Sequence, residues 1–225
     1  MADTIKKEDF IEIEYTGEVE GRVFDTTDEA KAKQAGVHSQ NTQYGPVVVC
    51  IGEGHLLKGL DAFLEGKETG KEYSVKLGPE QAFGKKNAQL IKLIPKNKFT
   101  SQNITPVPGM QLNIDGMIAT IKSISGGRVL VDYNHPLAGK DVDYKIKVNR
   151  KVTDIKEKLH AVIYMETHFK KDSYQLEIKD SKATITFKTE SSPVADEMKT
   201  IIEKIKQPLI EKLKSTTGIK EVEIK

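Results

Sequence analysis

The chain has 225 residues, of which 37% are hydrophobic and 30% are charged, and its formal net charge at pH 7 is +2. This length accommodates one large domain or two to three small ones, and the composition is typical of a soluble globular protein. The small net charge argues against a dedicated nucleic-acid-binding protein, because such proteins carry an excess of basic side chains.

The single cysteine and the lack of long apolar runs indicate where in the cell the protein is expected. Cys50 is flanked by apolar residues (VVVCIG), which indicates a buried, unreactive thiol, and no disulfide can form within the chain. Nowhere do 18 apolar residues follow one another, and the first ten residues lack the apolar segment of a secretory signal. We therefore expect a cytoplasmic protein whose partners are neither membranes nor nucleic acids.

The first part of the chain predicts an antiparallel sheet. Phe10–Val19 alternates as a half-buried strand, and a turn at Glu20-Gly21 leads into a second strand. The continuous apolar run 47–51 predicts a strand that is buried on both faces, and residues 71–77 alternate as a further strand.

Two short helices are predicted between these strands. Residues 27–36 form one, with Thr27 or Asp28 as the N-cap and Gly36 as its end. Residues 56–65 form the other, which is too short to be stable alone and so needs a sheet to lie on. Its apolar side chains follow one helical stripe and are Leu56, Leu57, Leu60, Phe63 and Leu64.

Residues 85–133 predict a small all-β unit inserted into the first domain. A proline-punctuated stretch is followed by three strands, which are joined by tight turns at Asp115-Gly116 and Gly126-Gly127. Residues 142–152 alternate again as a strand that is long enough to return to the first sheet. About 50 residues bury little surface, so part of the apolar side chains stays exposed. The expected exposed surface contains Met110, Met117 and Ile118.

The last part of the chain predicts an α-β-β-α-β unit. Asp154 is the expected N-cap of its first helix, with Glu157 completing a capping box, although residues 159–165 also fit a strand. A hairpin follows, and Ser192-Pro193 opens a long helix that Pro208 should kink or divide.

Six short motifs then carry a resemblance to a known family. In chain order they are Tyr15-Thr16-Gly17, Gly21-x-x-Phe24-Asp25, Ile51-Gly52-x-Gly54-x-Leu56-Leu57-x-Gly59-Leu60, Gly70-x-x-Tyr73, Pro79-Glu80-x-Ala82-Phe83-Gly84 and Asn134-His135-Pro136-Leu137-Ala138-Gly139. The chain thereby resembles the FKBP-type peptidyl-prolyl cis-trans isomerases, especially their long archaeal members and the SlyD proteins.

The resemblance implies an α+β fold with an antiparallel half-barrel, a short helix, an inserted chaperone domain in the flap and a C-terminal α+β domain. The implied segments are 1–84 and 134–153 for the isomerase domain, 85–133 for the insert and 154–225 for the last domain. The C-terminal domain is associated with dimerisation in the family, which makes a homodimer an expected partner state.

The resemblance also implies the site. The expected catalytic residues are Tyr15, Asp25, Leu57 and Phe83, and the expected substrate-binding residues are Phe24, Leu56, Leu60, His135, Leu137 and Tyr144. Leu60 and Phe83 stand where many members have Trp and Tyr, and Val47 replaces a common aromatic residue, which weakens an expectation of tight macrolide binding more than one of catalysis.

The expected function is isomerisation of X-Pro bonds in unfolded polypeptides, together with chaperone activity. Catalysis by a dry apolar pocket agrees with a sequence that has no nucleophile–base pair, no metal-ligand spacing among its histidines and no dinucleotide motif. We expect neither a cofactor nor a metal. The alternative is a holdase or dimeric adaptor that uses the same pocket to bind peptides without catalysis.

Overall fold

The computed structural model describes residues 3–40, 42–114, 116–188 and 195–225, and of 195–200 only the backbone. The chain divides into two compact units, Met1–Leu77 with Val142–Lys225 and Gly78–Asp141. We describe each unit by itself. The fold is α+β, as predicted, and the domain boundaries expected at residues 84, 133 and 153 stay predictions.

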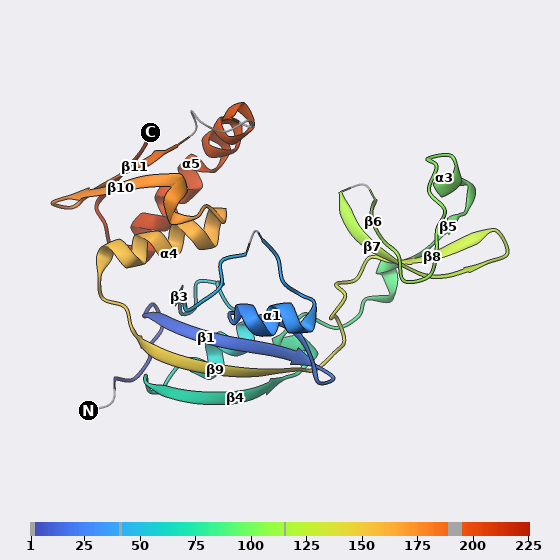
Figure 1. Cartoon of the computed structure of the whole chain (residues 1–225), viewed down its shortest axis with the longest axis horizontal. Coiled ribbons are helices and arrows are strands. Elements are labelled where there is room, and N and C mark those ends of the chain that lie inside the picture. The colour runs from blue at the N-terminus through green and yellow to red at the C-terminus, as the bar shows by residue number, and fades with distance from the viewer. Residues whose placement is uncertain (1–2, 41, 115, 189–194) are drawn as a thin grey trace. The chain divides into compact units, whose positions relative to one another are not determined.

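The first unit is built on a five-stranded antiparallel sheet. Its strand order is β2-β1-β9-β4, and β3 pairs with the remaining part of β1. Figure 1 shows β1, β9 and β4 side by side, so the strand after the insert does return to the first sheet, as predicted. The strands are β1 (Phe10–Val19), β2 (Arg22–Thr26), β3 (Val47–Cys50), β4 (Lys71–Leu77) and β9 (Val142–Lys151).

Two short helices belong to this sheet. Helix α1 (Glu29–Ala35) begins at Asp28, whose carboxylate accepts from the Lys31 N–H, and ends at Gly36 with φ 72°. Helix α2 (Lys58–Leu64) begins two residues later than predicted. The reason is local, because Leu57 is extended (φ −59°, ψ 142°) and caps the helix instead of joining it.

The prediction that residues 47–51 are buried on both faces is wrong for the first half of the run. Val49 and Cys50 are buried, whereas Val47 and Val48 are only half-buried. Strand β3 pairs with β1 alone, so it is an edge strand and one side of its beginning remains open.

The C-terminal part of this unit has the predicted α-β-β-α-β order. Its sheet has the order β10-β11-β12, with β10 antiparallel and β12 parallel to β11. The helical interpretation of residues 155–163 is confirmed, and Asp154 accepts from the Glu157 N–H. The elements are α4 (Ile155–Thr167), β10 (Tyr174–Lys179), β11 (Lys182–Phe187), α5 (Ala195–Thr217) and β12 (Glu221–Ile224).

Two details of this part were predicted only in part. Helix α5 runs through Pro208, so the helix is not divided there, and the alternative that Pro208 kinks it stays a prediction. Proline costs a helix about 3 kcal/mol, and burial of Leu209 and Leu213 beside it offsets that cost. The Glu157 carboxylate binds Arg150 instead of closing a capping box. The predicted helix start at Ser192-Pro193 lies outside the described residues.

The C-terminal elements share a core with the sheet. Phe10, Cys50 and Val152 lie in one buried cluster with Leu159, Val162, Ile185, Leu209 and Leu213. The apolar stripe of α5 is thus used within its own unit, and the expected homodimer stays a prediction. Among the described residues, no helix is both long and apolar enough to span a membrane.

The second unit is a four-stranded antiparallel sheet with the order β5-β8-β7-β6. The three predicted strands are present, while β5 and the short helix α3 in the proline-punctuated stretch were missed. Pro95 ends β5, an edge strand, where proline is tolerated. Asp115 of the first predicted turn lies outside the described residues. The elements are β5 (Ile91–Pro95), α3 (Asn97–Thr100), β6 (Gln111–Ile114), β7 (Met117–Ser125) and β8 (Arg128–Asp132). Short 3₁₀ turns lie at Pro79–Gln81 and Ala88–Leu90 in this unit and at Lys171–Ser173 in the first unit.

Candidate functional site

Three aromatic rings meet on neighbouring strands of the first unit. The ring centroids of Tyr15 and Tyr144 are 6.0 Å apart, and those of Phe24 and Tyr144 are 5.8 Å apart in an edge-to-face arrangement. Tyr144 is buried, whereas Tyr15 and Phe24 are half-buried. These contacts are within the favourable range for aromatic pairs, so the three rings form an ordered apolar wall.

Strand register explains why these rings meet. Gly17 on β1 lies opposite Asp25 on β2 and opposite Tyr144 on β9. A Cβ atom at Gly17 would lie 2.9 Å from Phe24 Cζ and 2.9 Å from Tyr144 Cε1, closer than van der Waals contact allows. Only glycine leaves room at this position for both rings.

Asp25 lies beside this wall and accepts a hydrogen bond from one of its tyrosines. The Tyr15 hydroxyl donates to Asp25 Oδ2 at 3.1 Å. Desolvation raises the pKa of the Asp25 carboxyl, while the hydrogen bonds from Tyr15 and from the Thr26 N–H act in the opposite direction. Burial and the neighbouring Asp25 carboxylate raise the pKa of Tyr15, so its hydroxyl stays a donor at neutral pH.

Two buried threonines, Thr26 and Thr27, hold the backbone of Tyr15, and this role was missed in the sequence. The Tyr15 N–H donates to Thr27 Oγ1 at 2.9 Å, and Thr26 Oγ1 donates to the Tyr15 carbonyl at 3.0 Å. Thr26 also shares a hydrogen bond with Thr16. The signal was the Asp-Thr-Thr sequence after a strand, which we interpreted only as a turn or cap.

The leucines of the predicted site lie at the start of α2. Leu60 is buried, and Leu56 and Leu57 are half-buried. The Leu57 carbonyl accepts from the N–H groups of Leu60 and Asp61. Its own N–H has no acceptor among the residues that the structure describes, as is usual for the first N–H groups of a helix. Leu57 thus offers a free backbone donor.

The other predicted residues belong to the second unit. The rings of Phe83 and His135 stack with centroids 4.5 Å apart, and the Leu137 N–H donates to His135 Nδ1 at 3.2 Å. Met117 and Ile118 are exposed, but Met110 is half-buried and packs against the core of this unit. The structure therefore brings together Tyr15, Phe24, Asp25 and Tyr144 by direct contacts, and separately Phe83, His135 and Leu137.

Reactive chemistry has little support in the part of the chain that the structure describes. No three side chains of His, Cys, Asp or Glu gather there as metal ligands. Cys50 is buried, and desolvation raises the pKa of its thiol to about 12, which confirms the predicted inert cysteine.

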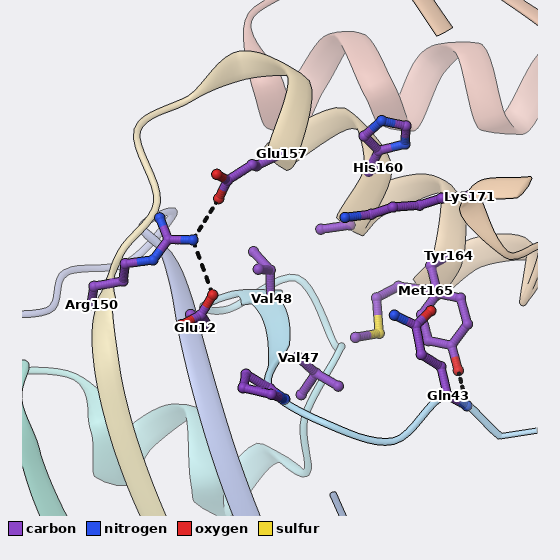
Figure 2. A pocket seen from close by; sticks show the side chains of 12 residues that line it. Glu12, Gln43, Val47, Val48, Arg150, Glu157, His160, Tyr164, Met165 and Lys171 are labelled. Carbon is purple, nitrogen blue, oxygen red and sulfur yellow. Dashed lines mark hydrogen bonds and ion pairs between the residues drawn. The ribbon is translucent and has the colours of Figure 1, made fainter. Parts of the chain in front are cut away.

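A cavity of about 250 Å³ lies between β3 and α4 of the first unit (Figure 2). Several of its polar groups are paired with one another. Arg150 donates to Glu12 at 3.0 Å and to Glu157 at 2.8 Å, and the Tyr164 hydroxyl accepts from the Gln43 N–H. These pairs connect the sheet to the C-terminal helices, so we assign the cavity to the interface between the sheet and these helices.

Two family models match parts of the chain. The family model for the FKBP-type peptidyl-prolyl cis-trans isomerase matches residues 2–105, and the model described as FKBP26, IF domain, matches residues 92–137. The chain is 35% identical over 148 residues to the short-type peptidyl-prolyl cis-trans isomerase of Methanocaldococcus jannaschii, which covers 66% of this chain and 94% of that protein.

More distant relatives match shorter parts. The chain is 32% identical to a probable FKBP-type 16 kDa peptidyl-prolyl cis-trans isomerase of Pseudomonas fluorescens, over 46% of this chain and 71% of that protein. It is 34% identical to the FKBP-type peptidyl-prolyl cis-trans isomerase SlyD of Vibrio cholerae, over 50% of this chain and 57% of that protein.

Proposed function

Because this chain belongs to the FKBP-type peptidyl-prolyl cis-trans isomerases, we propose that the wall of Tyr15, Phe24 and Tyr144, with Asp25 and Leu57, is where it binds and turns X-Pro bonds. The observation that carries the proposal is the contact set around Gly17, where two rings from different strands close on one glycine. Leu56 and Leu60 of the same unit complete the proposed substrate contacts, and the substrate-binding roles expected of Phe83, His135 and Leu137 stay predictions.

An apolar site suits this reaction because no covalent step is needed. Amide resonance gives the peptide bond a rotational barrier of about 18–20 kcal/mol, and cis and trans X-Pro differ by only about 0.5–1 kcal/mol. Water stabilises the polar planar amide more than the twisted one. Transfer into an apolar pocket removes that stabilisation, and each ~1.4 kcal/mol taken off the barrier increases the rate tenfold.

Leu57 and Asp25 supply the two polar elements of the proposed site. The free N–H of Leu57 is a donor for the substrate carbonyl and fixes the chain on one side of the rotating bond. Asp25 orients the Tyr15 ring through their hydrogen bond and faces the twisting amide. Leu57 and Asp25 act through their positions, and neither exchanges a proton in the proposed reaction. The hydroxyl of Tyr15 likewise remains protonated.

The donor role of Leu57 has a direct test. Leu57 has φ −59°, the value that proline requires, so Leu57→Pro removes the N–H without changing this torsion. Leu57→Ala removes the side chain and keeps the N–H. We expect kcat/KM on a short X-Pro peptide to be about tenfold lower for Leu57→Pro than for Leu57→Ala. Equal values in the two variants would refute the donor role.

We also propose that the second unit holds unfolded polypeptide clients. Leu93 and Ile118 are 59% and 65% exposed, and a groove of about 390 Å³ lies beside Phe99. Apolar side chains line part of the groove, including Leu93, Ile94, Phe99, Leu112 and Ile114, beside the polar Lys98, Gln102 and Asn113. Exposed apolar surface of this kind marks an interaction site and suits extended chains of varied sequence.

Client binding and catalysis can be separated by substitution. Leu93→Lys with Ile118→Lys should weaken suppression of the aggregation of an unfolded protein about tenfold or more, since each side chain contributes on the order of 1 kcal/mol. Isomerisation of a short X-Pro peptide should be unchanged. Ile201→Lys, which alters an apolar residue on α5 that is 50% exposed, is the control. A non-catalytic holdase would instead fail to accelerate the short peptide at all.

A further inference from the structure

The segment that carries Leu57 has little regular backbone structure of its own. We call residues 51–57, between β3 and α2, the presenting loop. Gly52 and Gly54 have φ values of 84° and 78°. At both positions the backbone is in a left-handed conformation that residues other than glycine rarely adopt. A loop of this kind positions a donor accurately only if other parts of the molecule hold it.

Lys212 of α5 holds the middle of the presenting loop. Its Nζ donates to Glu53 Oε2 at 2.8 Å and to the Glu53 carbonyl at 3.3 Å. Both side chains are only 26% exposed. Each charge shifts the other as expected of an ion pair, because Glu53 raises the pKa of Lys212 and Lys212 lowers the pKa of Glu53. The contact joins residues 159 positions apart in the sequence.

His55, near the end of the presenting loop, bonds strand β3 and lies close to helix α4. Its side chain is 4% exposed, and Nδ1 accepts from the Cys50 N–H at 3.0 Å, which leaves the ring proton on Nε2. Nε2 has no hydrogen-bond partner among the residues that the structure describes, and it lies 3.9 Å from Glu166 Oε1 of α4. Lys212 Nζ is 4.0 Å from the same carboxylate oxygen. His55 is two residues before Leu57.

We propose that helices α4 and α5 set the position of the presenting loop, and that Lys212 and Glu166 are positioning residues for isomerisation. The inference rests on the proposed function, because it assigns these residues to the Leu57 N–H. The proposal gives the C-terminal helices α4 and α5 a role in the isomerisation that this same chain carries out. The M. jannaschii short-type relative matches only 66% of this chain.

A purely structural role for this contact makes a different prediction. If Lys212 only attached the C-terminal elements to the sheet, its loss would lower the free energy of unfolding and leave the folded enzyme active. The large shared core around Phe10 and Val152 already provides that attachment. A bond to a loop carbonyl instead restricts the loop itself, and misplacement of a donor by about 1 Å can cost a hundredfold in rate.

The test uses three full-length variants under conditions where each is folded. Lys212→Met keeps the apolar stem and removes both bonds, Lys212→Arg keeps a cationic donor, and Lys182→Met breaks a 2.9 Å ion pair with Glu223 far along the C-terminal sheet. We expect Lys212→Met to lower kcat/KM on a short X-Pro peptide at least about fivefold, Lys212→Arg to restore most of it, and Lys182→Met to have no effect.

A second readout follows the loop directly. In Lys212→Met the amide NMR signal of Leu57 should shift or broaden, while those of Thr16 and Thr26 stay in place. Wild-type kcat/KM in Lys212→Met, or an equal loss in Lys182→Met, would overturn the positioning role. If Leu57→Pro nevertheless lowers activity, the proposed site stands without it, and if Leu57→Pro has no effect either, the proposed function of Leu57 fails as well.

Discussion

Gly17→Ala tests the aromatic site at its most restricted point. The added methyl group would lie 2.9 Å from Phe24 Cζ and from Tyr144 Cε1, and 3.0 Å from Tyr144 Cζ. Carbon atoms pack best at about 3.5–4.0 Å, so the rings must withdraw by about 0.6 Å or more. The half-buried Phe24 can move outward, whereas Tyr144 is 4% exposed and has little space, so its contact with the methyl group is the harder one to relieve.

The cost follows from overpacking. Extra methyl groups in a packed site cost about 1–3 kcal/mol, and the smaller unfolded-state entropy of alanine returns about 0.5–1 kcal/mol. We expect a net loss of about 1–2 kcal/mol in the free energy of unfolding. Displacement of the Phe24 ring from the proposed substrate wall should lower kcat/KM about tenfold, because catalysis by position is sensitive to shifts of this size.

Two measurements on folded protein check this prediction. Urea unfolding gives the stability change, and the cis-to-trans conversion of a short X-Pro peptide gives kcat/KM. Gly78→Ala is the matched control, since its Cβ would meet no atom within 4 Å and its φ is −72°. Wild-type activity in Gly17→Ala, or the same loss in Gly78→Ala, would show that the rings around Gly17 do not form the substrate wall.

Three further substitutions test single interactions. Thr27→Val should cost about 1–3 kcal/mol of stability because it leaves the Tyr15 N–H without its acceptor, and Thr27→Ser should not; equal urea midpoints would contradict the contact. Tyr15→Phe should raise the pKa of Asp25, since the hydroxyl lowers it, and an NMR titration that shows no rise would contradict this. Burial lowers the pKa of His160 to about 4, below its unfolded value of about 6.5, so the wild type loses stability as pH falls from 6.5 to 4. His160→Gln should remove about 1–2 kcal/mol of that loss after allowance for partial exposure, and identical pH profiles of urea stability would refute it.

Local rules made much of the fold predictable. Asp28 and Asp154 cap helices because their carboxylates reach N–H groups three residues ahead, and that geometry depends on neighbouring residues alone. The strand after the insert was recognisable from its alternation. Where local and distant effects compete, the sequence left alternatives open, such as a kink or a division of α5 at Pro208. Helix α5 continues through Pro208 because distant residues bury the side chains beside it.

The site divides in the same way. Tyr15, Phe24 and Asp25 stand in short motifs typical of one family, so the amino-acid order alone was sufficient to name them as candidates, and the resemblance added Tyr144. Only the tertiary structure showed that Gly17 makes room for two rings, that Thr27 anchors Tyr15 and that Lys212 reaches Glu53. Those contacts depend on strand register and on how helices pack, and both are set by the burial of side chains far apart in the chain, which no local pattern encodes.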